Sequence, residues 1–303
     1  MSNKLDVLLI GEYMKPAAPL ALVFAFLCQI IYGQSARPTA NALMRTFMVQ
    51  TATERGTIFS IDVDGREYWI TAKHLLKGLK HPPYGEFKEK STTVQILNPG
   101  LAGQQWITET FSVIDPGNNI DILVLVPSHL ILDKPMPLIV GDSVPMGGDC
   151  EFLGFPYGGG WRGKFDNQFY WLPYMKHCTV SGMFQEPSKG SPEDATVWVL
   201  DGINNAGFSG GPMLYSTGEQ QRVFAVVSGY QTEPTEVLPE VPSIPAPTGL
   251  PSKTPASDFS KKPKAPKKEV VNVNSGFIVA FDIKSAVDAI QKNPTGPVRP
   301  VPN

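Results

Sequence analysis

The feature that most limits what this chain can fold into is a succession of short β-rich runs, with no long helical period between them. Val, Ile, Thr and aromatic residues fill these runs, and Gly, Pro, Asn and Asp separate them, as in strands joined by turns. A first series lies within residues 44–135 and includes two runs on either side of Asp64-Gly65, which is a hairpin signal. A second series lies within residues 140–292 and ends in a run with helical spacing over 283–290. The sequence therefore predicts an all-β fold with two β units and a short C-terminal helix.

Prolines interrupt the second series of strands. Residues 231–270 are rich in proline, which removes a backbone donor and breaks both helices and central strands. We expect this segment to be a disordered loop between the last two strands. Its lysines suit either a solvated linker, which we favour, or contact with an anionic surface. The tail at 293–303 is also proline-rich, and we expect it to be flexible.

The amino terminus has the layout of a secretory signal peptide. An apolar run over residues 20–32 follows Lys15 and precedes small residues at 33–36. We therefore expect residues 1–36 to be removed and the mature protein to be extracytoplasmic, either periplasmic or secreted. Met14 is a second possible start. The alternative is an uncleaved anchor, because the run is long for a signal-peptide core and short for a bilayer span; only then would a membrane be a partner.

Composition narrows the class of partner. The chain has 303 residues, of which 42% are hydrophobic and 18% charged, enough for one large or two small cores. A formal net charge of −2 gives no reason to expect nucleic acid as a partner. After removal of the signal peptide, Cys150 and Cys178 are the remaining cysteines. They could form a disulfide or stay as two buried free thiols, and the sequence does not decide between these alternatives. His177 beside Cys178 offers too few ligands for a metal, so we predict no metal and no cofactor.

A run of small residues around Ser209 is the strongest functional signal. The stretch reads Gly-Phe-Ser-Gly-Gly-Pro from Gly207 to Pro212. A nucleophilic serine needs space for a substrate carbonyl and free backbone N–H groups for an oxyanion, and glycines supply both. On its own the stretch is equally well explained as a glycine-rich turn between strands.

A serine nucleophile also needs a base, and the base needs a partner that fixes its tautomer. Of the four histidines, only His74 ends a predicted strand in a small, apolar-bordered setting. Asp121 stands at the head of an otherwise apolar run, where an unpaired buried charge would be costly. Asp115 competes for this role, but the Pro-Gly that follows it favours a turn. We therefore predict a triad of His74, Asp121 and Ser209.

The motifs Thr-Ala-Lys-His74, Asn-Ile-Asp121-Ile-Leu and Gly-Phe-Ser209-Gly-Gly-Pro, in this order, resemble those of the trypsin/chymotrypsin superfamily. Segments 201–209 and 275–279 resemble bacterial HtrA (Deg)-type proteases more than pancreatic ones. The resemblance covers roughly residues 45–292 and includes no downstream PDZ-like domain. It implies two six-stranded antiparallel β-barrels of the chymotrypsin-like kind, with the site in the cleft between them.

The resemblance also implies roles for residues around the nucleophile. The N–H groups of Gly207 and Ser209 would form the oxyanion hole. Ser228 would lie on the strand that pairs with substrate and would support Asp121.

The same resemblance implies a specificity pocket. Ile203 would lie at its base, and Tyr230 and Gly276 would form its walls. Because Ile203 offers no carboxylate, we expect modest-sized apolar residues at P1 rather than Lys or Arg.

Phe208 departs from the family pattern. Pancreatic-type enzymes carry Asp at this position and HtrA-type enzymes commonly carry Asn, whereas phenylalanine can make neither polar contact. The oxyanion loop must then be held by apolar packing or by a substrate-induced shift. We favour the packed form, because a solvated phenylalanine beside a nucleophile would be unfavourable.

Together these features predict a secreted or periplasmic serine endopeptidase that cleaves peptide bonds through an acyl-enzyme. Its partners would be protein or peptide substrates, and its oligomeric state is not predicted. The alternative is a catalytically silent protease-fold module that binds peptides in the same cleft.

Overall fold

The computed structural model describes residues 40–77, 84–97, 105–132, 138–141, 144–165, 168–187, 194–217, 220–237 and 269–300. The predicted signal peptide and residues 238–268 lie outside these ranges. Within them, no helix is both long enough and apolar enough to cross a membrane.

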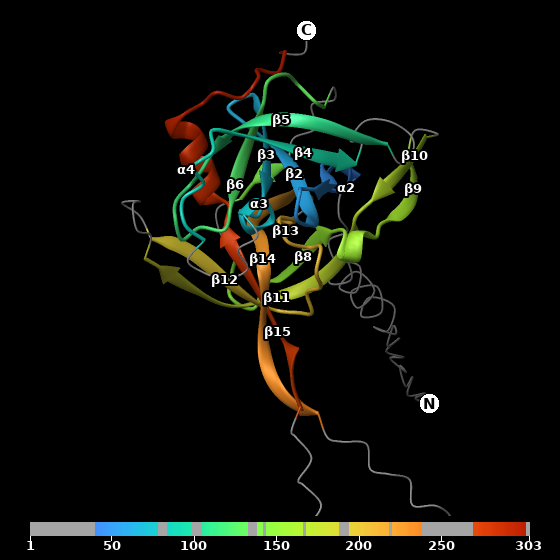
Figure 1. The fold of residues 1–303 in the computed structure, drawn as a ribbon, viewed down its shortest axis with the longest axis vertical. Helices are drawn as coiled ribbons and strands as arrows, with labels where there is room; N and C mark the ends of the chain where they lie inside the picture. The colour runs from blue at the N-terminus through green and yellow to red at the C-terminus, as the bar shows by residue number, and fades with distance from the viewer. Residues whose placement is uncertain are drawn as a thin grey trace, which may run out of the picture. The chain divides into compact units, whose positions relative to one another are not determined.

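The first six strands close into a barrel. They are β1 (Thr46–Gln50), β2 (Arg55–Val63), β3 (Arg66–Thr71), β4 (Ser91–Leu97), β5 (Trp106–Ile114) and β6 (Leu123–Pro127), in the spatial order β1-β2-β3-β6-β5-β4 (Figure 1). Helix α2 (Ala40–Met44) precedes the barrel, and the short α3 (His74–Lys77) follows β3. Asp64 and Gly65 adopt positive φ values of 50° and 71°, the conformation that a two-residue hairpin requires.

The second barrel is built from β8 (Asp149–Gly154), β11 (Tyr174–Glu186), β12 (Ala195–Asp201), β13 (Pro212–Thr217), β14 (Gln220–Val237) and β15 (Glu269–Asp282). Their order is β13-β8-β11-β12-β15-β14, and pairing of β13 with β14 closes the ring. Strand β7 (Ile139–Val140) adds to β14 in parallel, and helix α4 (Lys284–Lys292) follows β15. Two six-stranded barrels and a C-terminal helix are thereby confirmed.

Three large apolar clusters and one small cluster around Met48 and Phe155 lie within the described residues. One lies in the first barrel around Trp69 and Phe111, and one lies in the second barrel around Phe152 and Phe224. The third contains buried residues from both barrels and from α4, among them Ile290. The two barrels thus share a core, which fixes the position of one against the other and of any site between them.

Strands β14 and β15 continue beyond the barrel as a two-stranded arm (Figure 1). The ladder runs from Thr232 opposite Asn274 to Val237 opposite Glu269, so the loop predicted at 231–270 does not begin until after Val237. Pro234 lies inside β14 without ending it, because a strand that is paired on one side only can turn its missing N–H outward.

A second hairpin, of β9 (Trp161–Phe165) and β10 (Gln168–Leu172), was not predicted. Glycines at 158–160 and within β9 hide it in the sequence, since glycine lowers strand propensity. The short 3₁₀ turn η1 (Pro156–Gly158) precedes this hairpin.

Residues 293–300 make contacts with the first barrel, although the sequence predicts a flexible tail over 293–303. The backbone N–H of Arg299 donates to the carbonyl oxygen of Gly65 at 2.8 Å. Its buried guanidinium pairs with Asp62 at 2.5 Å and with Glu67. A buried arginine with two carboxylate partners is costly to release, and its partners are too distant in sequence to be foreseen.

Candidate active site

The turn that carries Ser209 lies between β12 and β13 and requires its glycines. Gly207 has a φ of +104°, and a Cβ on it would lie 2.3 Å from the carbonyl oxygen of Phe155. Gly210 has a φ of +83°, and its Cβ would lie 2.2 Å from the carbonyl oxygen of Thr57. The small residues on both sides of the serine are therefore needed for this backbone to pass so close to its neighbours.

His74 and Asp121 meet because β3 pairs with β6. His74 begins α3 directly after β3, and Asp121 lies just before β6. His74 Nδ1 is 2.6 Å from Asp121 Oδ2, and the backbone N–H of His74 donates to Asp121 Oδ1 at 2.9 Å. Both side chains are buried. This double contact fixes the ring orientation and leaves Nε2 as the nitrogen available for proton transfer.

Two hydroxyl groups complete the surroundings of the Asp121 carboxylate. Ser228 Oγ donates to Asp121 Oδ2 at 2.5 Å, and the hydroxyl of Tyr84 lies 3.2 Å from Ser228 Oγ. Burial, reinforced by the nearby charge of Asp121, raises the pKa of Tyr84, so its phenol stays protonated. The hydrogen bonds offset the desolvation of the buried charge. Sequence reasoning identified Ser228 through the resemblance but missed Tyr84.

Ser209 contacts the same strand. Its hydroxyl donates to the backbone oxygen of Ser228 at 3.0 Å, and no hydrogen bond of the described residues joins it to His74. The backbone N–H groups of Gly207 and Ser209 make no backbone hydrogen bond within the described ranges. Both of these donors are therefore available to a substrate oxygen.

Thr57, at the start of β2, holds the serine turn from the first barrel. Its backbone N–H donates to the carbonyl oxygen of Ser209 at 2.9 Å, and its hydroxyl donates to that of Gly207 at 2.7 Å. The same hydroxyl accepts the N–H of Phe155 at 3.2 Å. One buried residue, through its hydroxyl and its backbone N–H, thus holds peptide groups on both sides of Phe208, and no local sequence signal marked it.

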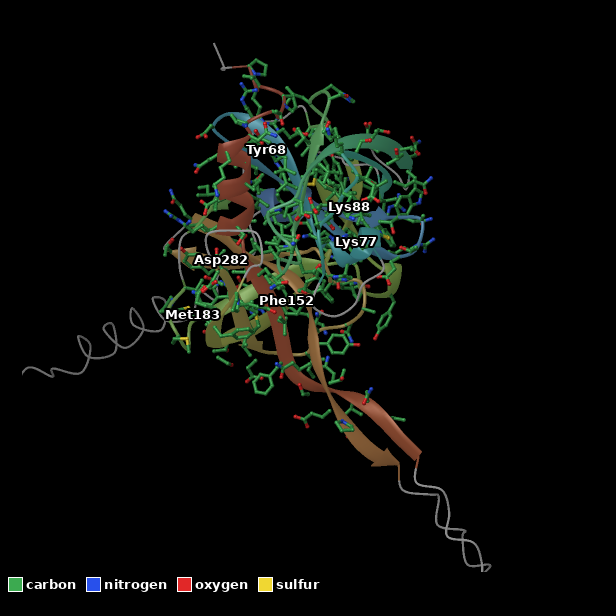
Figure 2. All side chains as sticks on the ribbon, turned by 60° about the vertical axis from the view of Figure 1, so that its left-hand side comes forward. Tyr68, Lys77, Lys88, Phe152, Met183 and Asp282 are labelled. Carbon is green, nitrogen blue, oxygen red and sulfur yellow. The ribbon has the colours of Figure 1, made fainter. Side chains whose placement is uncertain are left out.

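Phe208 is fully buried in the core of the second barrel, as expected for the packed form. Its ring lies 4.9 Å from that of Phe152, edge to face at 66°. Figure 2 shows Phe152 within this barrel. Lys176 Nζ lies 5.5 Å from the centre of the Phe208 ring. Apolar packing replaces the polar contact that Asp or Asn would make at this position.

Ile203 does not form a buried pocket base, because its side chain is 63% exposed. The turn instead places the neighbouring Asn204 inside. Asn204 Nδ2 donates to the backbone carbonyl oxygen of Gly229 at 3.2 Å. The backbone carbonyl oxygen of Asn204 accepts a hydrogen bond from Asn274 Nδ2 at 2.7 Å. Alternation at this turn directs one side chain inward and the next outward, which a motif match alone does not reveal.

The two expected walls lie near this turn. The backbone N–H of Gly202 donates to the carbonyl oxygen of Gly276 at 2.8 Å, which places Gly276 beside Ile203. Tyr230 lies on β14 opposite Ile278 and is 40% exposed.

Cys150 and Cys178 face each other across β8 and β11 as free thiols, with their sulfur atoms 2.8 Å apart. Both are buried. The residues that the structure describes contain no group of His, Cys, Asp or Glu side chains able to hold a metal ion.

No family model matches the chain, and no curated protein matches it. Solved structures of serine proteases are similar to it. Rv3671c from M. tuberculosis H37Rv, in an inactive form, shares 18% identity over 86% of this chain and 92% of that chain, with a TM-score of 0.48. The HtrA-type protease AlgW shares 16% over 84% of this chain and 63% of that chain, with a TM-score of 0.46. Deg5 shares 21% over 62% and 80% of the two chains, with a TM-score of 0.39.

Proposed function

We propose that this chain is a trypsin-like serine endopeptidase of the HtrA type that hydrolyses peptide bonds in proteins or peptides. The observation that carries the proposal is the buried Asp121 carboxylate, which binds both the ring and the backbone of His74. Ser228 contacts Asp121 through its hydroxyl and Ser209 through its carbonyl oxygen. Ser228 on β14 therefore contacts both the partner of His74 and the proposed nucleophile.

In the proposed reaction, Ser209 Oγ attacks the carbonyl carbon of the scissile bond while His74 Nε2 takes the hydroxyl proton. Asp121 stabilises the imidazolium that forms. The N–H groups of Gly207 and Ser209 hold the negative oxygen of the tetrahedral intermediate. His74 then protonates the leaving amine, and water hydrolyses the acyl-enzyme by the same proton transfers.

The resting position of the Ser209 hydroxyl is compatible with this reaction. It now donates to the carbonyl oxygen of Ser228, and a rotation about one side-chain bond redirects it. Catalytic hydrogen bonds are often unformed before substrate binds. We propose that substrate entry displaces the contact with Ser228 and turns Oγ toward His74 Nε2.

The test uses the chain without residues 1–36, a casein or peptide substrate and a fluorophosphonate probe. Ser209→Ala and His74→Ala should each lower kcat by several orders of magnitude with little change in melting temperature, because they act as one unit. Ser112→Ala and His129→Ala, both at exposed positions, are the matched controls and should keep wild-type turnover. Near wild-type turnover of His74→Ala would refute the assignment.

The second candidate is a catalytically silent peptide-binding module. The contact of Ser209 with Ser228 instead of His74 is the observation that favours it. Such a module would bind peptides in the cleft but would leave the fluorophosphonate unreacted. Labelling of wild type but not of Ser209→Ala would exclude it.

We also propose a preference for modest-sized apolar residues at P1. Ile203 and Tyr230 are exposed and apolar, and Gly276 lies beside Ile203 without a side chain. A peptide library cleaved mainly after Lys or Arg would contradict this.

Finally, we propose that the protein acts outside the cytoplasm after removal of residues 1–36. The apolar run with its flanking Lys15 and small residues supports this. Amino-terminal sequencing of the protein exported from a bacterial host should give a start close to residue 37.

A further inference from the structure

Lys73, directly before His74, is a fully buried lysine that the proposed reaction does not use. Its ammonium nitrogen lies 2.5 Å from Asp115 Oδ1. It also donates to the carbonyl oxygens of Gly117 at 2.6 Å and of Gly85 at 3.3 Å. The ammonium has three donors, and here they meet three oxygens.

Asp115 extends this contact to two loops. Its Oδ2 accepts the backbone N–H of Phe87 at 2.6 Å, and its Oδ1 accepts that of Gly117 at 3.1 Å. Its side chain is 12% exposed. The ion pair therefore ties the start of α3 to residues 85–87 and to residues 115–117.

Both tied loops lead directly to groups that hold the catalytic pair. Residues 115–117 lead into Asp121, which binds His74. Tyr84 stands immediately before the first loop and contacts Ser228, which in turn donates to Asp121. A displacement of either loop would shift one support of the Asp121 carboxylate.

Stability alone gives a poor account of this buried charge. Burial lowers the pKa of Lys73, and the ion pair with Asp115 opposes that shift; the charges of Asp121 and Lys77 also act on it, with opposite signs. An apolar side chain of the same length would avoid the desolvation cost, and replacing a buried ion pair by apolar residues is often neutral or stabilising. A methionine, however, could not bind the oxygens of both loops.

We propose that the Lys73–Asp115 ion pair is a positioning device that holds the His74–Asp121 pair in its reactive geometry. This inference rests on the proposed serine-protease function. Lys73 touches neither substrate nor the reacting atoms, and it acts through the two loops that it joins.

The test is a double-mutant cycle of Lys73→Met, Asp115→Asn and the double variant. Lys73→Met leaves a buried carboxylate unpaired and should lower both melting temperature and kcat. The double variant removes both charges, so its melting temperature should return close to that of wild type. Its kcat should stay about a hundredfold low at similar KM, because small misplacements of catalytic groups have effects of this size.

A spectroscopic signature reports the positioning independently of turnover. The proton in the short bond between His74 Nδ1 and Asp121 should give a strongly downfield NMR signal in wild type. It should weaken or move upfield in the double variant. Arg45→Met, which breaks the buried ion pair of Arg45 with Asp62 far from the site, is the matched control; it should lower melting temperature without changing kcat or the signal.

Recovery of kcat and of the downfield proton in the double variant would overturn the inference and leave the pair a structural one. Should the double variant not fold, Asp115→Asn decides. This single variant keeps Lys73 but removes the charge of Asp115, so it should lower kcat about tenfold and displace the downfield proton signal. A kcat and a proton signal equal to those of wild type would overturn the inference. An inactive wild type with a strongly downfield proton signal would instead refute the protease function. Failure of the positioning inference and failure of the proposed function therefore give different results.

Discussion

At the scale of single residues, Phe208 and Thr57 determine the shape of the oxyanion turn. Phe208 anchors the turn in the second barrel, and Thr57 reaches it from the first barrel with a 2.7 Å hydrogen bond to the carbonyl oxygen of Gly207. Because Phe208 is held by packing and the Gly207 carbonyl by a hydrogen bond, the peptide group between them has little freedom to flip. If Gly207 and Ser209 form the proposed oxyanion hole, we expect it to be preformed in the absence of substrate, which would lower the reorganisation needed in the transition state.

Phe208→Asn should lower both melting temperature and turnover. The change empties an apolar site beside Phe152 and buries an amide without hydrogen-bond partners, a loss of about 3–5 kcal/mol of unfolding free energy. If the turn then loses one oxyanion donor, kcat should fall about a hundred- to a thousandfold. Thermal unfolding and peptide hydrolysis measure the two effects.

Phe184→Asn is the matched control, since that phenylalanine is largely exposed on β11. It should change neither quantity appreciably. An increase in turnover of Phe208→Asn at unchanged stability would mean that Phe208 holds the site closed, which contradicts the packed model.

Glu151, on β8 in the second barrel, should make stability pH-dependent. Burial raises its pKa to about 7, partly offset by a hydrogen bond from Gln221. A carboxyl group whose folded pKa is raised stabilises the fold fully below its unfolded pKa, and this contribution is lost as pH rises through about 7. The melting temperature should therefore fall by a few degrees between pH 5 and pH 8.

Glu151→Gln mimics the protonated acid and should remove most of this fall, mainly by raising stability at pH 8. Glu89→Gln, at an exposed position shortly before β4, is the control and should keep the wild-type pH dependence. An equal fall in wild type and Glu151→Gln would assign the effect to another group.

At the scale of elements, strands were predictable where side-chain patterning was local. The two runs predicted on either side of Asp64-Gly65 are β2 and β3, and Ala286 and Ile290 form the buried face of α4. The pattern failed where a local rule was overridden by pairing. Pro234 favoured a loop in the sequence, yet β14 continues past it because β15 pairs with β14 as far as Val237.

The candidate site was predictable to the same extent. The structure brings His74 and Asp121 into contact, and their catalytic role stays a prediction. Thr57 and Lys73 were missed, because their partners lie in other elements and local sequence carries no sign of them. Ile203 was misplaced, because family position does not determine which side chain of a turn faces inward.

Replacing residues 238–268 by a short Asn-Gly connector should preserve the fold. Val237 and Glu269 are directly opposite each other at the end of the arm, where a two-residue turn can join them. Closing a shorter loop costs slightly less conformational entropy, so the melting temperature should stay within a few degrees of wild type. Differential scanning calorimetry checks this, and a loss of the cooperative transition would show that the segment is structural.

At the scale of the whole molecule, the segment after α4 binds the second barrel back onto the first. Arg66 Nη1 donates to the carbonyl oxygen of Gly296 at 2.7 Å, and the N–H of Gly296 donates to the hydroxyl of Tyr68 at 3.1 Å. Figure 2 labels Tyr68 in the first barrel. Together with Arg299 on Asp62, these contacts make a strap across the β2–β3 hairpin.

Arg299→Met should lower the unfolding free energy by about 3–5 kcal/mol, because it leaves the fully buried Glu67 without its arginine partner. Turnover well below the melting temperature should stay close to wild type, since the strap lies away from His74 and Ser209. Lys284→Met, which removes an exposed ion pair with Asp288, is the control and should change stability by less than about 1 kcal/mol. Equal melting temperatures of the two variants would refute the strap.

The strap imposes an order on biosynthesis. A nascent chain grows from its amino terminus, and an early domain commonly folds while later residues are still being added. Here Asp62 already has Arg45 as an early partner, but the buried carboxylate of Glu67 must wait for the guanidinium of Arg299, more than two hundred residues later in the chain. The first barrel should accordingly remain susceptible to proteolysis on stalled chains that end before Arg299, and become resistant only when Arg299 has emerged.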